Sequence, residues 1–192
     1  MGEFGSQKST IFVSSPRFYI SHWCTSDRQP FSGMVREPRV MRYIGRGETW
    51  HTAQVEQFIA RQQANFANLT YGLGPIKLHK NDQFIGMAGL QPLGNTEQVE
   101  IGCWLLPQFW GHNRADEIGE ALLRHGFINL GLTEIWALAR QQNRASIALM
   151  NRLGFRYHAT LWGWQLGLEA RDVETLVYKN VYSEHGSINE TV

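Results

Sequence analysis

The chain has 192 residues, which is enough for one well-buried domain and short for two. Its 43% apolar and 18% charged residues are typical of a globular protein and exclude a disordered one. A net charge of +1, with lysines and arginines scattered along the chain, argues against a nucleic-acid partner and against a polybasic membrane anchor.

The cysteines and the apolar runs favour a cytoplasmic protein with no metal site and no membrane segment. Cys24 and Cys103 lack the spacing of metal ligands, so we expect free thiols in a reducing compartment. No apolar run approaches the ~20 residues that a membrane helix needs, and the first residues lack a signal-peptide pattern. Residues 2–6 resemble a cloning-site remnant. We therefore expect residues 1–9 to be vector-derived or disordered, residues 10–183 to form one domain, and residues 184–192 to form a polar tail.

The first half of the chain alternates strand-like and helix-like patterns. In chain order we expect a strand over residues 12–23 interrupted at Pro16, a short helix over 27–35, a turn near Pro38, a helix capped by Thr52, and strands over 71–79 and 84–90. The helix after Thr52 carries one apolar face.

The central stretch is a strand, a tight loop and a helix. Residues 99–105 form an apolar run that Pro107 ends, because proline cannot donate to a strand ladder. From Asn113 onward, apolar residues recur every three to five positions, as on one helix face. This order aims backbone N–H groups and the positive end of a helix dipole at one point, which suits a phosphate. A capped helix with no ligand has the same pattern, so the loop alone leaves both interpretations open.

The last third adds strands and one short helix. We expect a strand over 134–140, a helix that Asn143 caps and Gly154 ends, and closing strands over 155–164 and 173–182. By itself, this pattern indicates a mixed α/β protein without fixing its topology.

Two groups of residues at a fixed separation identify a family. The first group comprises Glu100-Ile101-Gly102-Cys103-Trp104-Leu105, Pro107, Trp110-Gly111, Ala115 and Glu117, and the second comprises Asn143-Arg144-Ala145-Ser146 and Gly154-Phe155. Together they resemble the GNAT superfamily of acyl-CoA-dependent N-acetyltransferases, in its ribosomal-protein-alanine acetyltransferase (RimJ/RimL-like) branch. The resemblance implies an α/β fold with a splayed mixed sheet in the order β-α-α-β-β-β-α-β-α-β-β. It also implies an enzyme that transfers acetyl directly from acetyl-CoA to a primary amine, either a protein N-terminal α-amine or a small-molecule amine.

The resemblance places acetyl-CoA along the central strand and at the loop that follows. In the family, the backbone of the strand pairs with the pantetheine arm, and the N–H groups of the loop bind the pyrophosphate. The cofactor residues implied here are Leu105, Trp110, Gly111, His112, Asn113, Arg114, Ala115, Asp116, Asn143 and Ser146. No metal is implied.

Asn113 stands where the family usually has glycine. Asparagine tolerates left-handed backbone angles, so the loop conformation remains open to it. Its side chain could be neutral, could donate to a phosphate, or could crowd the anion. We expect crowding, because a small residue at this position lets the backbone approach the phosphate.

The resemblance also assigns candidate catalytic residues. Glu100 on the central strand is the candidate base, acting through water, although a carboxylate there could equally form an ordinary salt bridge. The N–H of Cys103 faces the thioester carbonyl, while its thiol is expected to pack in the core. Met150 occupies the position of the family's tyrosine acid, and Ser146 is the substitute that the branch suggests. Ser146 and Asn143 could instead serve only the start of their helix.

Two other functions stay open. Asn113 and the missing tyrosine suggest a GNAT-like module that binds CoA for sensing or scaffolding without catalysis. A phosphate-binding module unrelated to CoA is the third option. We expect acetyl-CoA and an amine as partners, with a homodimer as one option and no nucleic acid or membrane. Seven tryptophans would suit a stacking platform for single-stranded nucleic acid, but the basic groove is missing, so most are expected to pack in the core.

Overall fold

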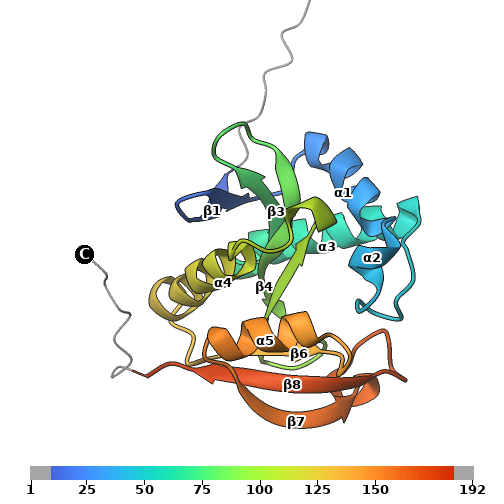
Figure 1. The fold of residues 1–192 in the computed structure, drawn as a ribbon, viewed down its shortest axis with the longest axis vertical. Coiled ribbons are helices and arrows are strands. Elements are labelled where there is room, and N and C mark those ends of the chain that lie inside the picture. The colour runs from blue at the N-terminus through green and yellow to red at the C-terminus, as the bar shows by residue number, and fades with distance from the viewer. Residues whose placement is uncertain (1–9, 184–192) are drawn as a thin grey trace, which may run out of the picture.

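The computed structural model describes residues 10–183, which build a sheet with helices on both faces (Figure 1). The strands are β1 Ile11–Ser14, β2 Phe18–Ser21, β3 Leu73–Leu78, β4 Phe84–Pro92, β5 Val99–Leu105, β6 Glu134–Ala139, β7 Arg156–Trp162 and β8 Glu174–Val181. The helices are α1 Arg28–Val35, α2 Pro38–Met41, α3 Thr52–Leu69, α4 Arg114–Arg124 and α5 Arg144–Arg152. The expected vector-derived segment 1–9 and polar tail 184–192 lie outside the described residues.

The sheet splays in its middle. Its order is β1-β2-β3-β4-β5-β6-β8-β7, and every neighbouring pair is antiparallel except β5 and β6. Those two parallel strands share one registered pair, Glu100 with Trp136, and then diverge. The expected α/β class with a splayed mixed sheet is therefore confirmed.

The N-terminal region differs in detail from its prediction. The expected single strand over 12–23 is a hairpin of β1 and β2, because Pro16 lacks an N–H and the chain turns there, with Ser15 N–H donating to the carbonyl of Phe18 at 2.9 Å. His51, and not Thr52, is the N-cap of α3. Its backbone is extended, and its N–H donates to the side chain of Gln54 at 3.0 Å.

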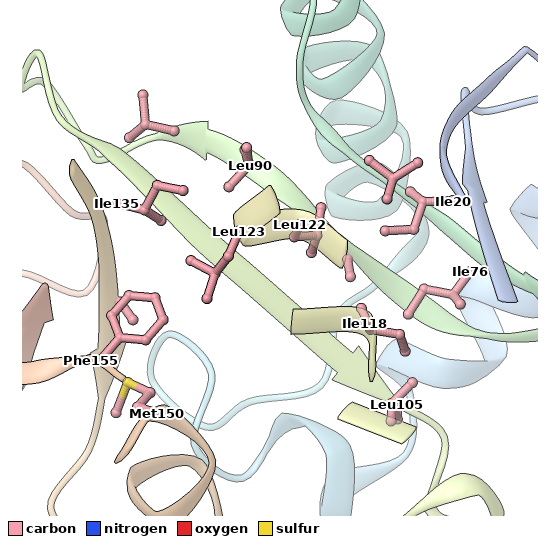
Figure 2. Close-up of a cluster of buried hydrophobic side chains, with 14 of the residues drawn as sticks. Ile20, Ile76, Leu90, Leu105, Ile118, Leu122, Leu123, Ile135, Met150 and Phe155 are labelled. Carbon is pink, nitrogen blue, oxygen red and sulfur yellow. The ribbon is translucent and has the colours of Figure 1, made fainter. Parts of the chain in front are cut away.

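Two hydrophobic cores lie on opposite faces of the sheet because successive strand residues point to opposite sides. Along β5, Ile101, Cys103 and Leu105 face the core that α4 and α5 cover, whereas Trp104 faces the core beneath α1, α2 and α3. Figure 2 shows the first core, in which apolar residues of α4 meet the sheet; its fully buried members include Leu122, Ile135 and Phe155.

The middle of α4 packs closely against the C-terminal end of α5. A Cβ at Gly119 would lie 2.4 Å from a methyl of Leu153, so a larger residue here would require the Leu153 side chain to move. The expected ends of α5 are both present: the side chain of Asn143 accepts from Ser146 N–H at 3.2 Å, and Gly154 follows the helix with a φ of +82°.

Candidate active site

The splay leaves one edge of β5 without a strand partner. Leu106 N–H donates to the carbonyl of Ile85 at 2.9 Å, which fixes the alternation of the β4–β5 ladder. The backbone groups of Cys103 and Leu105 therefore point away from β4, toward the side where β6 has diverged. This edge provides the N–H groups and carbonyls that an extended ligand needs in order to pair with a strand.

The loop after β5 forms an anion-binding turn. Gly111, His112 and Asn113 follow one another in the left-handed region, with φ angles of +79°, +54° and +53°. The N–H groups of such a turn point in one direction. Those of the three residues, and that of Ala115 at the start of α4, make no hydrogen bond within residues 10–183. Two non-glycine residues in the left-handed region cost ~1–2 kcal/mol each, and such strain concentrates at ligand sites.

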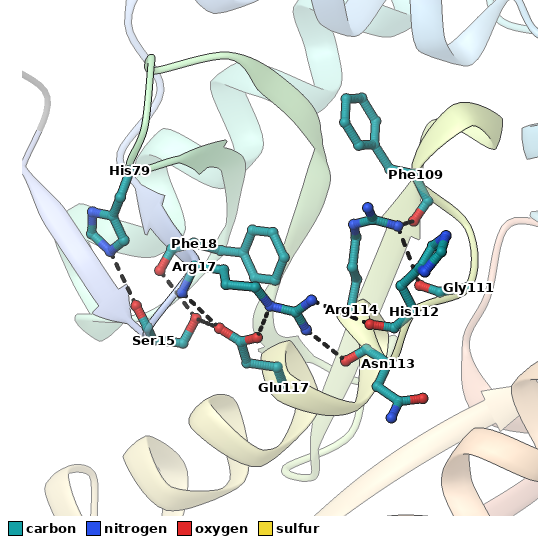
Figure 3. A network of polar contacts seen from close by, with 10 residues as sticks. All are labelled: Ser15, Arg17, Phe18, His79, Phe109, Gly111, His112, Asn113, Arg114 and Glu117. Atoms are coloured by element: carbon teal, nitrogen blue, oxygen red, sulfur yellow. Dashed lines mark hydrogen bonds and ion pairs between the residues drawn. The ribbon is translucent and has the colours of Figure 1, made fainter.

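The carbonyls of the same loop are bound from the opposite side by arginines (Figure 3). Arg17, in the turn between β1 and β2, donates to the carbonyls of His112 at 3.2 Å and Asn113 at 3.3 Å. Arg114 donates to the carbonyls of Phe109 and Gly111, both at 3.4 Å. The carbonyl oxygens of the loop therefore accept hydrogen bonds from arginine side chains, while the N–H groups of residues 111–113 have no partner among the described residues.

The acidic residues in the first turn of α4 are neutralised. Asp116 pairs with Arg152 of α5 at 2.5 Å, and this hydrogen bond holds the pKa of the Asp116 carboxyl below its ordinary value. Burial would raise the pKa of Glu117, but hydrogen bonds from Arg17 and Ser15 outweigh it and lower that pKa. Both carboxylates interact favourably with the positive N-terminal end of the α4 dipole. Their arginine partners reduce the electrostatic repulsion between these carboxylates and a bound phosphate.

Trp110 caps the end of β5. Its indole Nε1 donates to the carbonyl of Leu105 at 2.8 Å, although 49% of the residue is exposed. Since a carbonyl has two lone pairs, Leu105 keeps one acceptor position and its N–H for a ligand.

Glu100 lies on the face of β5 that α3 covers and is the only expected site residue with a strongly shifted carboxyl. Burial raises the pKa of Glu100 to about 7, while a hydrogen bond from Gln91 and the charge of Arg61 act in the opposite direction. Gln91 Nε2 donates to Glu100 at 2.6 Å, and Gln62 of α3 in turn donates to Gln91 at 3.0 Å. Within the described part of the chain, Glu100 forms no ion pair, and its hydrogen-bond partner is Gln91.

The thiol of Cys103 is unsuited to nucleophilic attack. It packs against the core beneath α4, and burial raises the pKa of Cys103 to about 12, so the thiolate is scarce at neutral pH. Met150, in the position of the family's tyrosine, is buried in the same core (Figure 2). The side chain at this position therefore offers no proton to a leaving group.

Asn143 and Ser146 lie at the opposite end of α5 from the phosphate loop. Arg152, near the C-terminal end of α5, contacts Asp116, so Ser146 lies roughly 10 Å further along the helix. The Oδ1 of Asn143 is engaged in the cap, which leaves its amide Nδ2 and the hydroxyl of Ser146 for other contacts. A ligand bound at the loop of residues 111–115 would reach these residues only if it extended along the length of α5.

An aromatic cluster lies on the same face of β5 as Glu100, beneath α3. The ring of Trp104 lies 5.7 Å from that of Trp50 and 5.9 Å from that of Phe58. Two ion pairs join this side to the loop between β7 and β8, Arg61 with Glu169 at 3.5 Å and Arg46 with Asp172 at 2.9 Å. Among the tryptophans, Trp23 is buried, three others are half-buried, and Trp110, Trp162 and Trp164 are exposed.

Sequence patterns missed two sets of residues. Arg17 is separated from the loop by about a hundred positions and belongs to a region expected to be a plain strand. Gln91 and Gln62 are uncharged and carry no motif. The only available signal was the antiparallel pairing of 84–90 with 99–105, which would have placed Gln91 opposite Glu100.

Among residues 10–183, no group of three or more His, Cys, Asp or Glu side chains could hold a metal ion. None of the helices described is both long and apolar enough to cross a membrane.

Comparisons with known proteins agree on one family. A profile described as "Acetyltransferase (GNAT) domain" matches residues 17–156. YoaA of Bacillus subtilis (strain 168), an uncharacterized N-acetyltransferase, is 30% identical over 154 residues, covering 78% of this chain and 85% of YoaA.

Solved structures show the same fold. RimJ of Mycobacterium smegmatis, in complex with a CoA disulfide, has a TM-score of 0.72 and 17% identity, covering 92% of each chain. Spermidine N-acetyltransferase of Vibrio cholerae, in complex with CoA and spermine, has a TM-score of 0.69 and 14% identity, covering 85% of this chain and 95% of its own. At such identities the similarity concerns the fold alone.

Proposed function

Because this chain belongs to the GNAT acetyltransferase family, we propose that it transfers the acetyl group of acetyl-CoA to a primary amine, either a protein N-terminal α-amine or a small-molecule amine. The RimJ/RimL-like branch is part of this proposal. It is supported by the motif around Glu100 and by the fold shared with RimJ.

The observation that carries the proposal is the left-handed turn of Gly111, His112 and Asn113. Free N–H groups at the start of a helix suit the pyrophosphate of CoA. The free edge of β5, just before this loop in the chain, can pair with the pantetheine amides. The anion-binding loop and the free strand edge therefore lie next to each other, as a ligand with a pyrophosphate beside an amide-containing arm requires.

Glu100 is proposed to accept the proton that the amine must lose, directly or through one water. A base with a pKa of about 7 is half ionised at neutral pH, which suits this task. An α-amine has an ordinary pKa of about 8 and a lysine amine about 10.4, so the α-amine is more easily deprotonated. The amine nitrogen then bonds to the acetyl carbon, the carbon–sulfur bond breaks, and the thiolate of CoA takes up a proton from solvent or from Ser146. The N–H of Cys103 is proposed to donate to the negative oxygen that forms and so stabilise it.

The test is release of the free CoA thiol from acetyl-CoA with four acceptor classes: peptides with a free N-terminus, N-terminally blocked lysine peptides, polyamines and aminoglycosides. We expect turnover with at least one class, and calorimetric binding of CoA without any acceptor. A protein that does not bind CoA would refute the proposal.

The buried Met150 favours one second candidate, a module that binds CoA without catalysis, because no tyrosine acid is present. This candidate predicts calorimetric binding of CoA with no turnover for any of the four acceptor classes.

A further inference from the structure

We propose that Arg17 is a positioning residue for the phosphate loop: it orients the free N–H groups of Gly111, His112 and Asn113 toward the cofactor by binding the carbonyls on their opposite side. This inference rests on the proposed function. It assigns a role in cofactor binding to a residue at the β1–β2 turn, far from the loop in sequence.

The geometry of Arg17 fits one task. Its two terminal nitrogens bind successive carbonyls, those of His112 and Asn113, at 3.2 and 3.3 Å (Figure 3). In a left-handed turn, carbonyls and N–H groups point in opposite directions, so holding the carbonyls fixes the direction of the donors. A planar guanidinium can make both contacts together, and a lysine ammonium cannot reproduce this fork.

Glu117 in turn fixes Arg17. One carboxylate oxygen accepts from the Nε of Arg17 at 2.5 Å, and the other accepts from the backbone N–H of Arg17 at 2.9 Å and from Ser15 Oγ at 2.7 Å. The side chain of Glu117 is 17% exposed and that of Arg17 is 45% exposed. The contacts therefore run from the partly buried carboxylate of Glu117 on α4, through Arg17 in the β1–β2 turn, to the carbonyls of the loop.

A contribution to folding alone does not explain this arrangement. Ion pairs with one exposed partner contribute little to stability. The bonds to His112 and Asn113 hold residues that are strained and whose N–H groups have no partner among the described residues, which is the pattern of a site organised for a ligand.

The test compares Arg17→Lys and Glu117→Gln with wild type by calorimetric titration with CoA, well below the unfolding temperature. Arg17→Lys keeps the charge and loses the fork, and we expect CoA to bind about tenfold more weakly, the effect of losing about one charge-assisted hydrogen bond. In the acetyl-transfer assay, KM for acetyl-CoA should rise with kcat unchanged. Arg28→Gln is the matched control, because Arg28 forms an exposed ion pair with Glu56 away from the loop, and its CoA affinity should equal that of wild type.

Glu117→Gln separates position from charge. It removes a negative charge from the helix start, so electrostatics alone would tighten CoA binding, whereas a released Arg17 would weaken it. We expect weaker binding, by a few-fold. Affinity within twofold of wild type in Arg17→Lys, with only a lower unfolding temperature, would assign Arg17 to structure. Tighter CoA binding in Glu117→Gln would also overturn the inference. If Arg17→Lys does not fold, the CoA affinity of Glu117→Gln alone tests the role of Arg17. If wild type itself does not bind CoA, the proposed function fails first.

Discussion

Replacing Glu100 with glutamine tests the base assignment most directly. Glutamine keeps the size of the side chain and can still accept a hydrogen bond from Gln91, but it cannot take a proton near neutral pH. Since a positioned base contributes ~10²–10⁴-fold, we expect turnover to fall by at least ~10²-fold at pH 7–8. CoA affinity should stay unchanged, because Glu100 faces α3 and the phosphate loop begins beyond the end of β5.

The pKa of Glu100 sets the shape of the pH profile. With a pKa of about 7, the ionised fraction is about one tenth at pH 6 and about nine tenths at pH 8, so kcat/KM of wild type should rise tenfold per pH unit below pH 7 and level off above it. Gln91→Met removes the amide that donates to Glu100, so it should raise the pKa of Glu100 and move this rise to higher pH.

Stability gives an internal control. The folded pKa of Glu100 lies above its ordinary value of 4.5, so its contribution to stability is fully present below pH 4.5 and is lost as the pH rises through about 7. Glutamine does not ionise, so the Glu100→Gln protein does not lose stability as the pH rises. Its free energy of unfolding at pH 8 should exceed that of wild type by ~1–2 kcal/mol, after allowing for partial solvent contact. Urea unfolding at pH 5 and pH 8 measures the difference. An unchanged rate and pH profile in a well-folded Glu100→Gln protein would show that Glu100 is not the base.

Three further changes have defined outcomes. Asn113→Gly should tighten CoA binding in a calorimetric titration, because the side chain makes no cap hydrogen bond and its removal lets the loop amides approach the phosphates; weaker binding would make Asn113 a ligand contact. Leu122→Ala should cost ~2–5 kcal/mol in urea unfolding, because Leu122 is 0% exposed, and a cost under ~1 kcal/mol would contradict its place in the core. The pKa values of Asp116 and Glu117 are lowered, so the stability from their arginine pairs is present above their ordinary pKa values and is lost as the pH falls through the folded ones; unfolding free energies of wild type that do not fall between pH 5 and pH 3 would refute this.

The order of elements and the central loop could be predicted because both depend on local patterns. The strand ending at Pro107, the helix after Asn113 and the cap at Asn143 are each set by neighbouring residues, and the structure has all three. The family motif then supplied the topology, which periodicity could not, since alternation identifies a strand without identifying its partner.

What could not be predicted depends on contacts between distant residues. The pKa of Glu100 reflects burial by α3 and an amide from β4, and the loop conformation depends on Arg17 from the β1–β2 turn. Neither contact can be predicted from the residues that neighbour the site in the sequence. The hairpin at Pro16 was missed for a related reason, because β-forming residues continue on both sides of the turn.

The single registered pair between β5 and β6 divides the sheet into two parts with unequal freedom to change. The strand β5 belongs to the first five strands, which share antiparallel ladders, whereas β6, β8 and β7 form a separate antiparallel unit. Changing the angle between the two units would break few ladder hydrogen bonds. Substitutions in the second unit can therefore move the loop between β7 and β8 over the α3 face while β5 and the phosphate loop stay in place. If the proposed function holds, a chain built in this way can acquire a different amine acceptor while β5 and the phosphate loop keep their conformation.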